Sequence, residues 1–206
     1  MHSFKSYLEE GRDAPLYHGP GSIVTLLEII KDNVLKGKTN NQERFDKWGD
    51  TSQHLVKADH FKKKNQKLIG ISLSRDMKRS LNWHGGQCCF ELNQRKLVQR
   101  HKVVPINIFM ALGQNKHAKD EELAEEFVIG DIKNLKEYTN RIIFKRGSTI
   151  TNFLNYSLIY LGPKDILGYT IYDLEKKKSY TINNKKDFIQ LARDYNATNV
   201  LDIVDG

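Results

Sequence analysis

The stretch GISLSRD, residues 70–76, has the pattern of a buried β-strand that ends in small hydroxyl residues and leads directly into a helix. Apolar residues fill most of positions 67–73, a length typical of a strand, and Gly70 allows close approach of a neighbouring backbone. Ser74 suits the N-cap of the following helix, and Asp76 falls in its first turn, where the helix dipole favours an anion. We therefore expect the hydroxyl groups at a strand end, facing whatever cleft lies there.

The composition indicates a globular protein that does not enter a bilayer. Of its 206 residues, 39% are hydrophobic and 10% aromatic, whereas 28% are charged. No apolar run reaches the ~18 residues that a membrane span requires, and the N-terminal segment lacks the apolar centre of a signal peptide. We predict no membrane partner and a cytoplasmic location, either in the cell that makes the protein or after delivery into a host or target cell.

The two cysteines, Cys88 and Cys89, are adjacent in the sequence. On a strand their side chains would point to opposite faces, so we expect no disulfide between them. Their spacing matches no zinc-binding pattern, and the sequence predicts no metal site. Buried free thiols are the expectation.

The chain is basic, with a formal net charge of +8 and lysines gathered at residues 62–67, 176–178 and 185–186. Two interpretations stay open at this point. The lysines are solvated on loop tips, or their summed field attracts a polyanionic ligand such as nucleic acid.

Hydrophobic periodicity predicts an α+β fold. Residues 16–19 suit a short strand, and apolar residues at helical spacing from Ser22 through Val34 predict a helix that ends at Gly37. Between residues 87 and 144 we expect strands with hardly a helix between them, unlike a doubly wound sheet. We therefore predict two facing mixed or antiparallel sheets with a cleft between them and flanking helices. Strands are expected at 67–73, 87–92, 103–108, 125–130 and 141–144, with a turn at 93–96 and a loop at 113–123.

From residue 148 the character of the sequence changes. We divide the chain into a domain at 1–147 and an accessory C-terminal subdomain at 148–206, with its own apolar cluster around Phe188, Leu191 and Tyr195. Its elements are expected to be a helix at 148–161, a hairpin of strands 169–174 and 179–182, and a helix at 185–195.

Three short pieces occur along the chain in a particular order: LYHG at 16–19, GISLS at 70–74 and EEFVI at 125–129. Together they resemble the three-part signature of the ADP-ribosyltransferase superfamily. The first is similar to the Tyr/Trp-His-Gly strand of the diphtheria-toxin-like and poly(ADP-ribose) polymerase branch. The second is similar to the Ser-x-Ser strand of the arginine-specific toxin branch. The resemblance covers about residues 14–145 and implies an ADP-ribosyltransferase-like fold that binds NAD as its substrate.

The resemblance implies an enzyme that breaks the bond between nicotinamide and ribose in NAD through an oxocarbenium-like transition state. A carboxylate beneath the sugar would accept a hydrogen bond from a ribose hydroxyl and stabilise the developing positive charge. In the family, the catalytic glutamate precedes three apolar residues and then Pro or Gly. That pattern matches Glu126, with Glu125 as the alternative. Arginine-specific relatives carry Gln or Glu two positions earlier, where this chain has Ala124, so the acceptor of ADP-ribose is an unidentified protein or nucleic acid.

The resemblance also implies contacts to NAD from the first strand. His18 would reach the adenosine ribose through its ring, and Gly19 would let backbone N–H and C=O groups approach the nicotinamide carboxamide. From the residue type alone, His18 could equally be a partly buried imidazole bonded to a backbone carbonyl.

Four further residues belong to the expected site. Ser72 or Ser74 would support the nicotinamide ribose or the catalytic glutamate, against the alternative that they only cap a helix. Tyr17 and Trp83 would stack on nicotinamide, or would belong to the core as aromatic residues commonly do. We expect the histidine, one of the serines and the glutamate to converge in one cleft.

Three functions are compatible with these residues. The first is transfer of ADP-ribose from NAD to a macromolecule with release of nicotinamide. The second is action on ADP-ribosylated or 2′-phosphorylated RNA, as by tRNA 2′-phosphotransferases. Those enzymes rely on basic residues where this chain has His18 and Glu126, and the carboxylate counts against this function. The third is a non-catalytic nucleic-acid or protein binding module on the same fold, using the lysine clusters.

Overall fold

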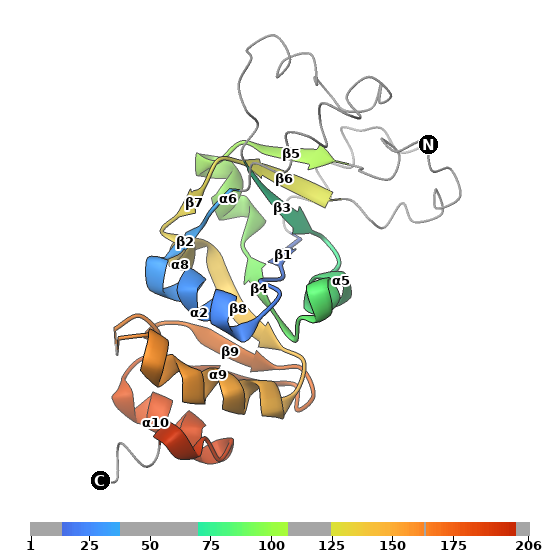
Figure 1. Ribbon diagram of the computed structural model, residues 1–206. Coiled ribbons are helices and arrows are strands. Elements are labelled where there is room, and N and C mark those ends of the chain that lie inside the picture. Colours follow the sequence, from blue (N-terminus) through green and yellow to red (C-terminus); the bar gives the residue numbers. More distant parts are fainter. Residues whose placement is uncertain (1–13, 38–69, 107–124, 163, 201–206) are drawn as a thin grey trace.

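The structure is a computed structural model in which a twisted β-sheet crosses the molecule with helices packed on it (Figure 1). The polar segment at 38–67, with its lysine cluster, and the loop at 113–123 that the sequence predicts lie outside the residues that the structure describes. The described residues are 14–37, 70–106, 125–162 and 164–200.

Eight strands in the described part of the chain are hydrogen-bonded into one sheet. They are β1 Leu16–His18, β3 Gly70–Ser74, β4 Cys88–Leu92, β5 Val103–Ile106, β6 Glu125–Ile129, β8 Thr139–Phe144, β9 Thr170–Asp173 and β10 Lys178–Thr181. Their order is β10-β9-β8-β4-β1-β3-β6-β5, and every neighbouring pair is antiparallel except β8 with β9. The α+β class is confirmed. The strands form one continuous sheet rather than two facing ones, because β1 pairs with β3 on one side and with β4 on the other.

Helices cover both faces of this sheet. Five of them, α2, α6, α8, α9 and α10, contribute to the large apolar cluster on one face, and α5 packs on the other face. The helices are α2 Ile23–Asp32, α5 Met77–Asn82 with the 3₁₀ turn η1 Trp83–Gly85, α6 Gln94–Arg100, α8 Leu135–Tyr138, α9 Gly147–Tyr160 and α10 Lys185–Asp194.

The helix predicted after Ser22 is present but ends earlier than expected. The Ser22 hydroxyl accepts a hydrogen bond from the Thr25 N–H, as an N-cap does. Its C-cap is Asn33 in the left-handed conformation, with a φ of 52°, rather than Gly37, because Asn tolerates that conformation. The chain then forms the short strand β2 Val34–Leu35, which pairs with β7 Ile132–Lys133 in a separate two-stranded sheet.

The turn predicted at 93–96 is wrong, since helix α6 begins there. The Asn93 side chain accepts a hydrogen bond from the Lys96 N–H and so caps a helix instead of closing a turn. Leu97 is the buried apolar residue that anchors this short polar helix to the sheet.

The two faces of the sheet contribute to different clusters. Adjacent residues on a strand alternate between the faces, and Cys88 and Cys89 accordingly belong to different clusters. Both thiols are free and buried. The larger cluster includes Leu16, Leu73, Phe90, Leu92, Ile142 and Phe144, and the smaller one consists of Leu81, Cys89 and Ile143 with partly buried neighbours.

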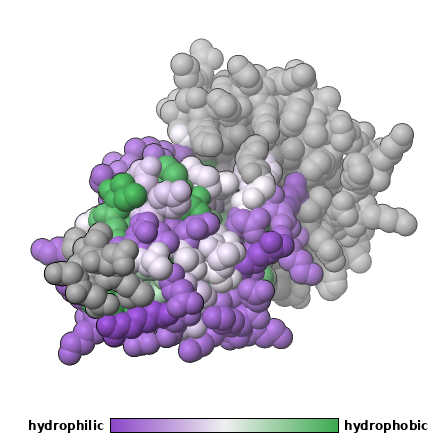
Figure 2. All heavy atoms as spheres, turned by 60° about the horizontal axis from the view of Figure 1, so that its bottom comes forward, coloured by the Kyte–Doolittle hydropathy of each residue, from purple (hydrophilic) through white to green (hydrophobic). Residues whose placement is uncertain are grey.

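The C-terminal residues continue the sheet and the core of the preceding part. Strand β9 pairs in parallel with β8, and α9 packs against α2. Leu191 and Tyr195, expected to centre a separate cluster, belong to the large cluster that also contains Leu16. The division at residue 147 stays a prediction. Figure 2 shows the molecule with this C-terminal region turned forward; its surface is mostly hydrophilic, with a small hydrophobic area.

Among the described helices, none is long and apolar enough to cross a membrane. In the same residues, no group of three or more His, Cys, Asp or Glu side chains is arranged to hold a metal ion.

Candidate functional site

The three strands that carry the motifs are direct neighbours in the sheet, in the order β1, β3, β6. In the register, Tyr17 lies opposite Ser74, and Ser74 lies opposite Glu125. The adjacent pair on β3 and β6 is Leu73 with Glu126. The pairing of these three adjacent strands therefore brings together residues that are far apart in the sequence.

His18 and Glu126 share one face of the sheet. Side chains alternate along a strand, and directly opposite residues of antiparallel strands project to the same face. His18 follows Tyr17 and so projects to the face opposite to that of Tyr17, which is the face of Leu73 and Glu126. Since neighbouring strands lie ~4.8 Å apart, about 10 Å separates the two backbones that carry the histidine and the glutamate. Buried Leu73 lies between them.

Ser72 and Ser74 project from the other face, together with Tyr17. The strands thus meet as expected, while the side chains expected to converge are divided between the two faces of the sheet. For Glu125, the structure describes the backbone, which pairs with Ser74.

Glu126 forms a buried ion pair with Arg75, the residue that follows Ser74. Arg75 Nε donates to Glu126 Oε1 at 2.8 Å, and Arg75 Nη2 contacts the same oxygen at 2.7 Å. The side chains are only 16% and 4% exposed, respectively. A charge-assisted pair of this kind orients the carboxylate firmly.

Two opposing effects act on the pKa of Glu126. Burial raises it above the ordinary value for a glutamate, and the charge and hydrogen bond of Arg75 lower it, with burial the larger effect. The carboxyl group therefore has little water around it, and Arg75 supplies the positive charge that favours its ionised form. An anion in such a place interacts more strongly with a nearby positive charge than it would in water.

His18 is held by the backbone of the serine strand. Its Nδ1 lies 3.3 Å from the carbonyl oxygen of Ser72. Because a carbonyl oxygen can only accept, Nδ1 carries the hydrogen in this contact, and Nε2 of the neutral ring is then an acceptor. This is the backbone-bonded imidazole that the residue type alone allowed.

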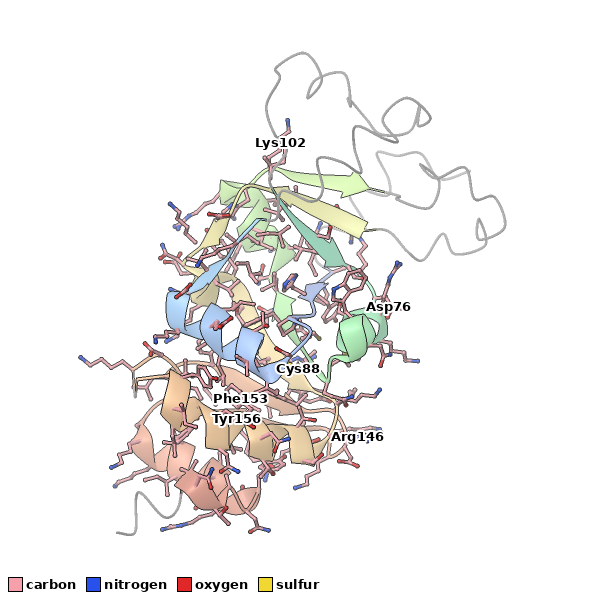
Figure 3. All side chains as sticks on the ribbon, in the orientation of Figure 1. Asp76, Cys88, Lys102, Arg146, Phe153 and Tyr156 are labelled. Carbon is pink, nitrogen blue, oxygen red and sulfur yellow. The ribbon has the colours of Figure 1, made fainter. Side chains whose placement is uncertain are left out.

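Ser74 does not cap the helix that follows; that prediction is wrong. Asp76 is the N-cap, and its Oδ1 accepts a hydrogen bond from the Lys78 N–H at 2.8 Å. The Ser74 hydroxyl accepts from the Asp76 N–H at 3.0 Å, so it organises the turn between β3 and α5. In Figure 3, Asp76 lies at the start of α5 on the edge of the molecule.

Gly19 is required for packing against α5. A Cβ atom on Gly19 would lie 2.2 Å from the carbonyl oxygen of Ser80 and 3.1 Å from Cβ of Trp83. The space that the missing side chain leaves is thus filled by α5 and η1. Contacts of its backbone N–H and C=O groups with nicotinamide stay a prediction.

The two aromatic residues of the expected site have different surroundings. Trp83 is 45% exposed at the end of α5. Tyr17 is half-buried, and burial, aided by the negative charge of Glu91, raises its pKa to about 12. Tyr17 therefore stays protonated at neutral pH.

A second Glu–Arg pair lies on the face of Tyr17. Glu91, opposite Tyr17 in the register, accepts at Oε2 from Arg141 Nε at 2.9 Å and contacts Arg141 Nη2 at 2.8 Å. The Arg141 guanidinium also lies 4.2 Å from the ring centroid of Tyr172. This pair has the same one-oxygen geometry as Arg75 with Glu126, on neighbouring strands of the same sheet.

Sequence reasoning did not assign a role to Arg75. Its partner is 51 positions away, and only the pairing of β3 with β6 brings the two together. The available signal was a basic residue directly after the serine strand and an acidic residue at the start of the EEFVI strand.

Comparison with protein-family models, with curated proteins and with solved structures found no match for this chain.

Proposed function

We propose that the chain is an NAD-dependent ADP-ribosyltransferase that moves ADP-ribose to a macromolecular acceptor and releases nicotinamide. One observation supports this most directly: Glu126 is a buried carboxylate, oriented by Arg75, on the sheet face that His18 shares. The adjacency of the three motif strands is what the resemblance to the superfamily requires.

The proposed chemistry begins with cleavage of the bond between ribose C1′ and the nicotinamide nitrogen. Its electron pair leaves with nicotinamide, which becomes neutral, and positive charge develops on the ribose. The Glu126 carboxylate stabilises that charge and accepts a hydrogen bond from a ribose hydroxyl through Oε2, because Arg75 contacts Oε1. A nucleophilic atom of the acceptor then forms the new bond to C1′ and loses its proton.

His18 and Arg75 have supporting roles in this proposal. The Nε2 atom of His18 accepts a hydrogen bond from a hydroxyl of the adenosine ribose, with the ring held by the carbonyl of Ser72. Arg75 touches no substrate and acts as a positioning residue, since it fixes the direction of the Glu126 carboxylate.

The test is nicotinamide release from NAD by wild-type protein and by Glu126→Gln. The substitution keeps the size of the side chain and removes its charge, so we expect turnover to fall by on the order of 10²-fold or more with NAD binding largely retained. Glu91→Gln is the matched control, because it removes the charge of the other Glu–Arg pair and leaves Glu126, Arg75 and His18 unchanged.

Two outcomes would revise the assignment. If Glu126→Gln kept wild-type turnover while Glu125→Gln abolished it, the catalytic residue would be one position earlier. If both variants stayed active, or if Glu91→Gln lost as much activity as Glu126→Gln, neither glutamate would have the proposed role.

A non-catalytic binding module on the same fold is a second candidate, supported by the same ion pair. A carboxylate that Arg75 neutralises and that is only 3% exposed can stabilise the junction of β3 and β6 without contacting any ligand. Wild-type protein that binds NAD or nucleic acid and never releases nicotinamide would favour this candidate over the enzyme.

A further inference from the structure

Basic side chains from three separate segments gather along one edge of the molecule. We call this the basic edge. The segments are the start of α5, the junction of β8 with α9, and the turn between β9 and β10 with the first residue of β10. The basic edge consists of Lys78, Arg79, Lys145, Arg146, Lys176, Lys177 and Lys178.

Hydrogen bonds join these segments to one another. Lys145 Nζ donates to Asn82 Oδ1 at 2.9 Å, which connects the β8–α9 junction to the end of α5. The Gly147 N–H donates to Glu175 Oε2 at 3.2 Å, which connects the start of α9 to the hairpin turn. In Figure 3, Arg146 lies on the same side of the molecule as Asp76 at the start of α5. The seven cations therefore belong to one continuous region.

Positive charge prevails in this region. Its nearby carboxylates are Asp76, Asp173 and Glu175. Each accepts hydrogen bonds from the backbone: Asp76 from the Lys78 N–H, Asp173 from the Glu175 and Lys176 N–H groups, and Glu175 from the Gly147 N–H. Asp173 is fully buried, so the seven cations exceed the exposed negative charge. Arg146 and the three turn lysines are exposed. Such an excess of cations attracts a polyanion over distances of about a Debye length, ~8 Å at physiological salt.

Two of the turn lysines are held in place by aromatic rings. Lys176 Nζ lies 4.2 Å from the ring centroid of Tyr195, and Lys178 Nζ lies 4.7 Å from that of Tyr180. A lysine that already rests on an aromatic ring has fewer conformations, so it loses less conformational entropy when it binds a ligand. These lysines are better prepared for an anion than solvated lysines on a mobile loop tip.

Trp83 adds an exposed aromatic ring beside these cations. It follows Asn82, the residue that Lys145 contacts, and 45% of its surface is exposed. An aromatic face next to a basic groove is the usual way in which proteins bind single-stranded nucleic acid, because bases stack on the ring while cations contact phosphates.

We propose that the basic edge, with Trp83, binds single-stranded nucleic acid. An anionic membrane surface fits less well, because insertion would need several exposed apolar residues near the cations. The other large exposed apolar side chains of the described residues lie on α2, α6 and the second half of α9, away from the hairpin turn. Binding at this surface does not depend on the catalytic proposal.

The first test uses Trp83 as its own reporter. The chain has two tryptophans, so Trp48→Phe leaves Trp83 as the only one. Titration with a single-stranded oligonucleotide should quench its fluorescence as bases stack on the ring. Binding detected by a labelled oligonucleotide with no change in Trp83 fluorescence would overturn the stacking role and with it the single-strand assignment.

The second test compares two charge reversals of equal size. Arg146→Glu/Lys177→Glu alters the basic edge, and Lys185→Glu/Lys186→Glu alters exposed lysines at the opposite end of the hairpin. Both double variants change the charge by the same amount. The glutamates at 146, 185 and 186 lie at the N-termini of α9 and α10, which tolerate negative charge, and the glutamate at 177 lies in an exposed turn.

The first double variant should weaken oligonucleotide affinity about tenfold or more at 0.1 M salt, and reduce the slope of log affinity against log salt by about 1.4. The control should bind almost as wild type does. Arg146→Gln/Lys177→Gln, which removes the charges without reversing them, should give a smaller loss in the same direction.

Three results would contradict the proposal. Equal losses in both double variants would mean that overall charge, and not the basic edge, drives binding. Equal affinity for a duplex of the same charge would exclude the single-strand preference. Tighter binding to vesicles containing anionic lipid, abolished by the same double variant, would assign the surface to a membrane instead.

Discussion

Among single residues, Arg75 has two effects on the proposed site: it fixes the direction of the Glu126 carboxylate, and it compensates the buried negative charge. Removing one partner of a buried pair leaves an uncompensated charge, which costs more than the pair contributes when intact. A loss of activity in a Glu126 variant therefore has two physical causes to separate: loss of the carboxylate in the transition state, and exposure of an unpaired Arg75.

A double-mutant cycle measures the second of these causes, the cost of an unpaired partner, as a change in the free energy of unfolding. Arg75→Met alone should lower the free energy of unfolding by about 3 kcal/mol, because Glu126 is then buried without a partner. Arg75→Met/Glu126→Leu should recover most of that loss, since apolar groups of similar volume can replace a buried ion pair. Urea denaturation of wild type, Arg75→Met, Glu126→Leu and the double variant measures all values of the cycle.

The same cycle at Arg141 and Glu91 is the comparison. Arg141 is more exposed than Arg75, so breaking this pair should cost clearly less. Equal costs in the two cycles, or a double variant at Arg75 and Glu126 no more stable than the single one, would show that the ion pair does not determine the stability of the site.

At the scale of elements, the approach of β1 to α5 depends on Gly19. Gly19 follows the last residue of β1, and its Cα faces the backbone at the end of α5. A backbone atom cannot move aside as the end of a flexible side chain can. Any side chain at position 19 therefore displaces the whole helix, with Trp83 and Asp76 attached to it.

Gly19→Ala should lower the free energy of unfolding by about 2 kcal/mol or more, because its Cβ would be 2.2 Å from the Ser80 carbonyl oxygen. Gly130→Ala is the control: Gly130 has a positive φ of 82° and nothing within 4 Å of its Cβ position, so only backbone strain of about 1 kcal/mol applies. Urea denaturation distinguishes the two. A Gly19→Ala protein at least as stable as Gly130→Ala would contradict this packing.

Hydrophobic periodicity predicted most of the elements and missed those that depend on polar residues. The helix after Ser22, the serine strand, the EEFVI strand and the C-terminal hairpin are all present. Helix α6 was not predicted, because its sequence, QRKLVQR, has a single buried apolar residue, Leu97, and so shows no helical periodicity. Its N-cap, Asn93, is also a residue type that is common in turns.

The candidate site was predictable as a set of neighbouring strands but not as a set of side chains. Order along the chain suggested that the three motifs meet. Which face each side chain occupies depends on register, and a shift of one residue exchanges the faces. That is why His18 and Glu126 share a face that Ser72 and Ser74 do not, and why the partnership of Arg75 was invisible in the sequence.

At the scale of the whole molecule, buried thiol and phenol groups link folding to pH. Burial raises the pKa of Cys88 to about 12, and burial also raises the pKa of Cys89, Tyr169 and Tyr195. In the unfolded chain these groups titrate near 9.0 for the thiols and 10.0 for the phenols. All of them therefore bind their protons more tightly when the protein is folded.

The stability contribution of such groups is complete below their unfolded pKa and is lost as pH rises toward the folded value. We expect the free energy of unfolding to fall by about 2 kcal/mol between pH 9 and 10 from the two thiols alone, since one pKa unit corresponds to ~1.4 kcal/mol for each group. Urea denaturation at pH 8, 9 and 10 measures this. Cys88→Ala/Cys89→Ala should show a shallower decline, and an unchanged decline would assign it to other groups.

The central position of β1 determines when this protein can fold. Its three residues form the first strand of the described part of the chain to be synthesised, yet its partners, β3 and β4, come more than fifty positions later. Loop closure over such distances is slow. Until it occurs, β1 cannot join β4 on one side of the sheet to β3 on the other. The nascent chain therefore stays open until at least Leu92 has emerged, with the apolar strands around Ile71 and Phe90 unprotected from association with other chains.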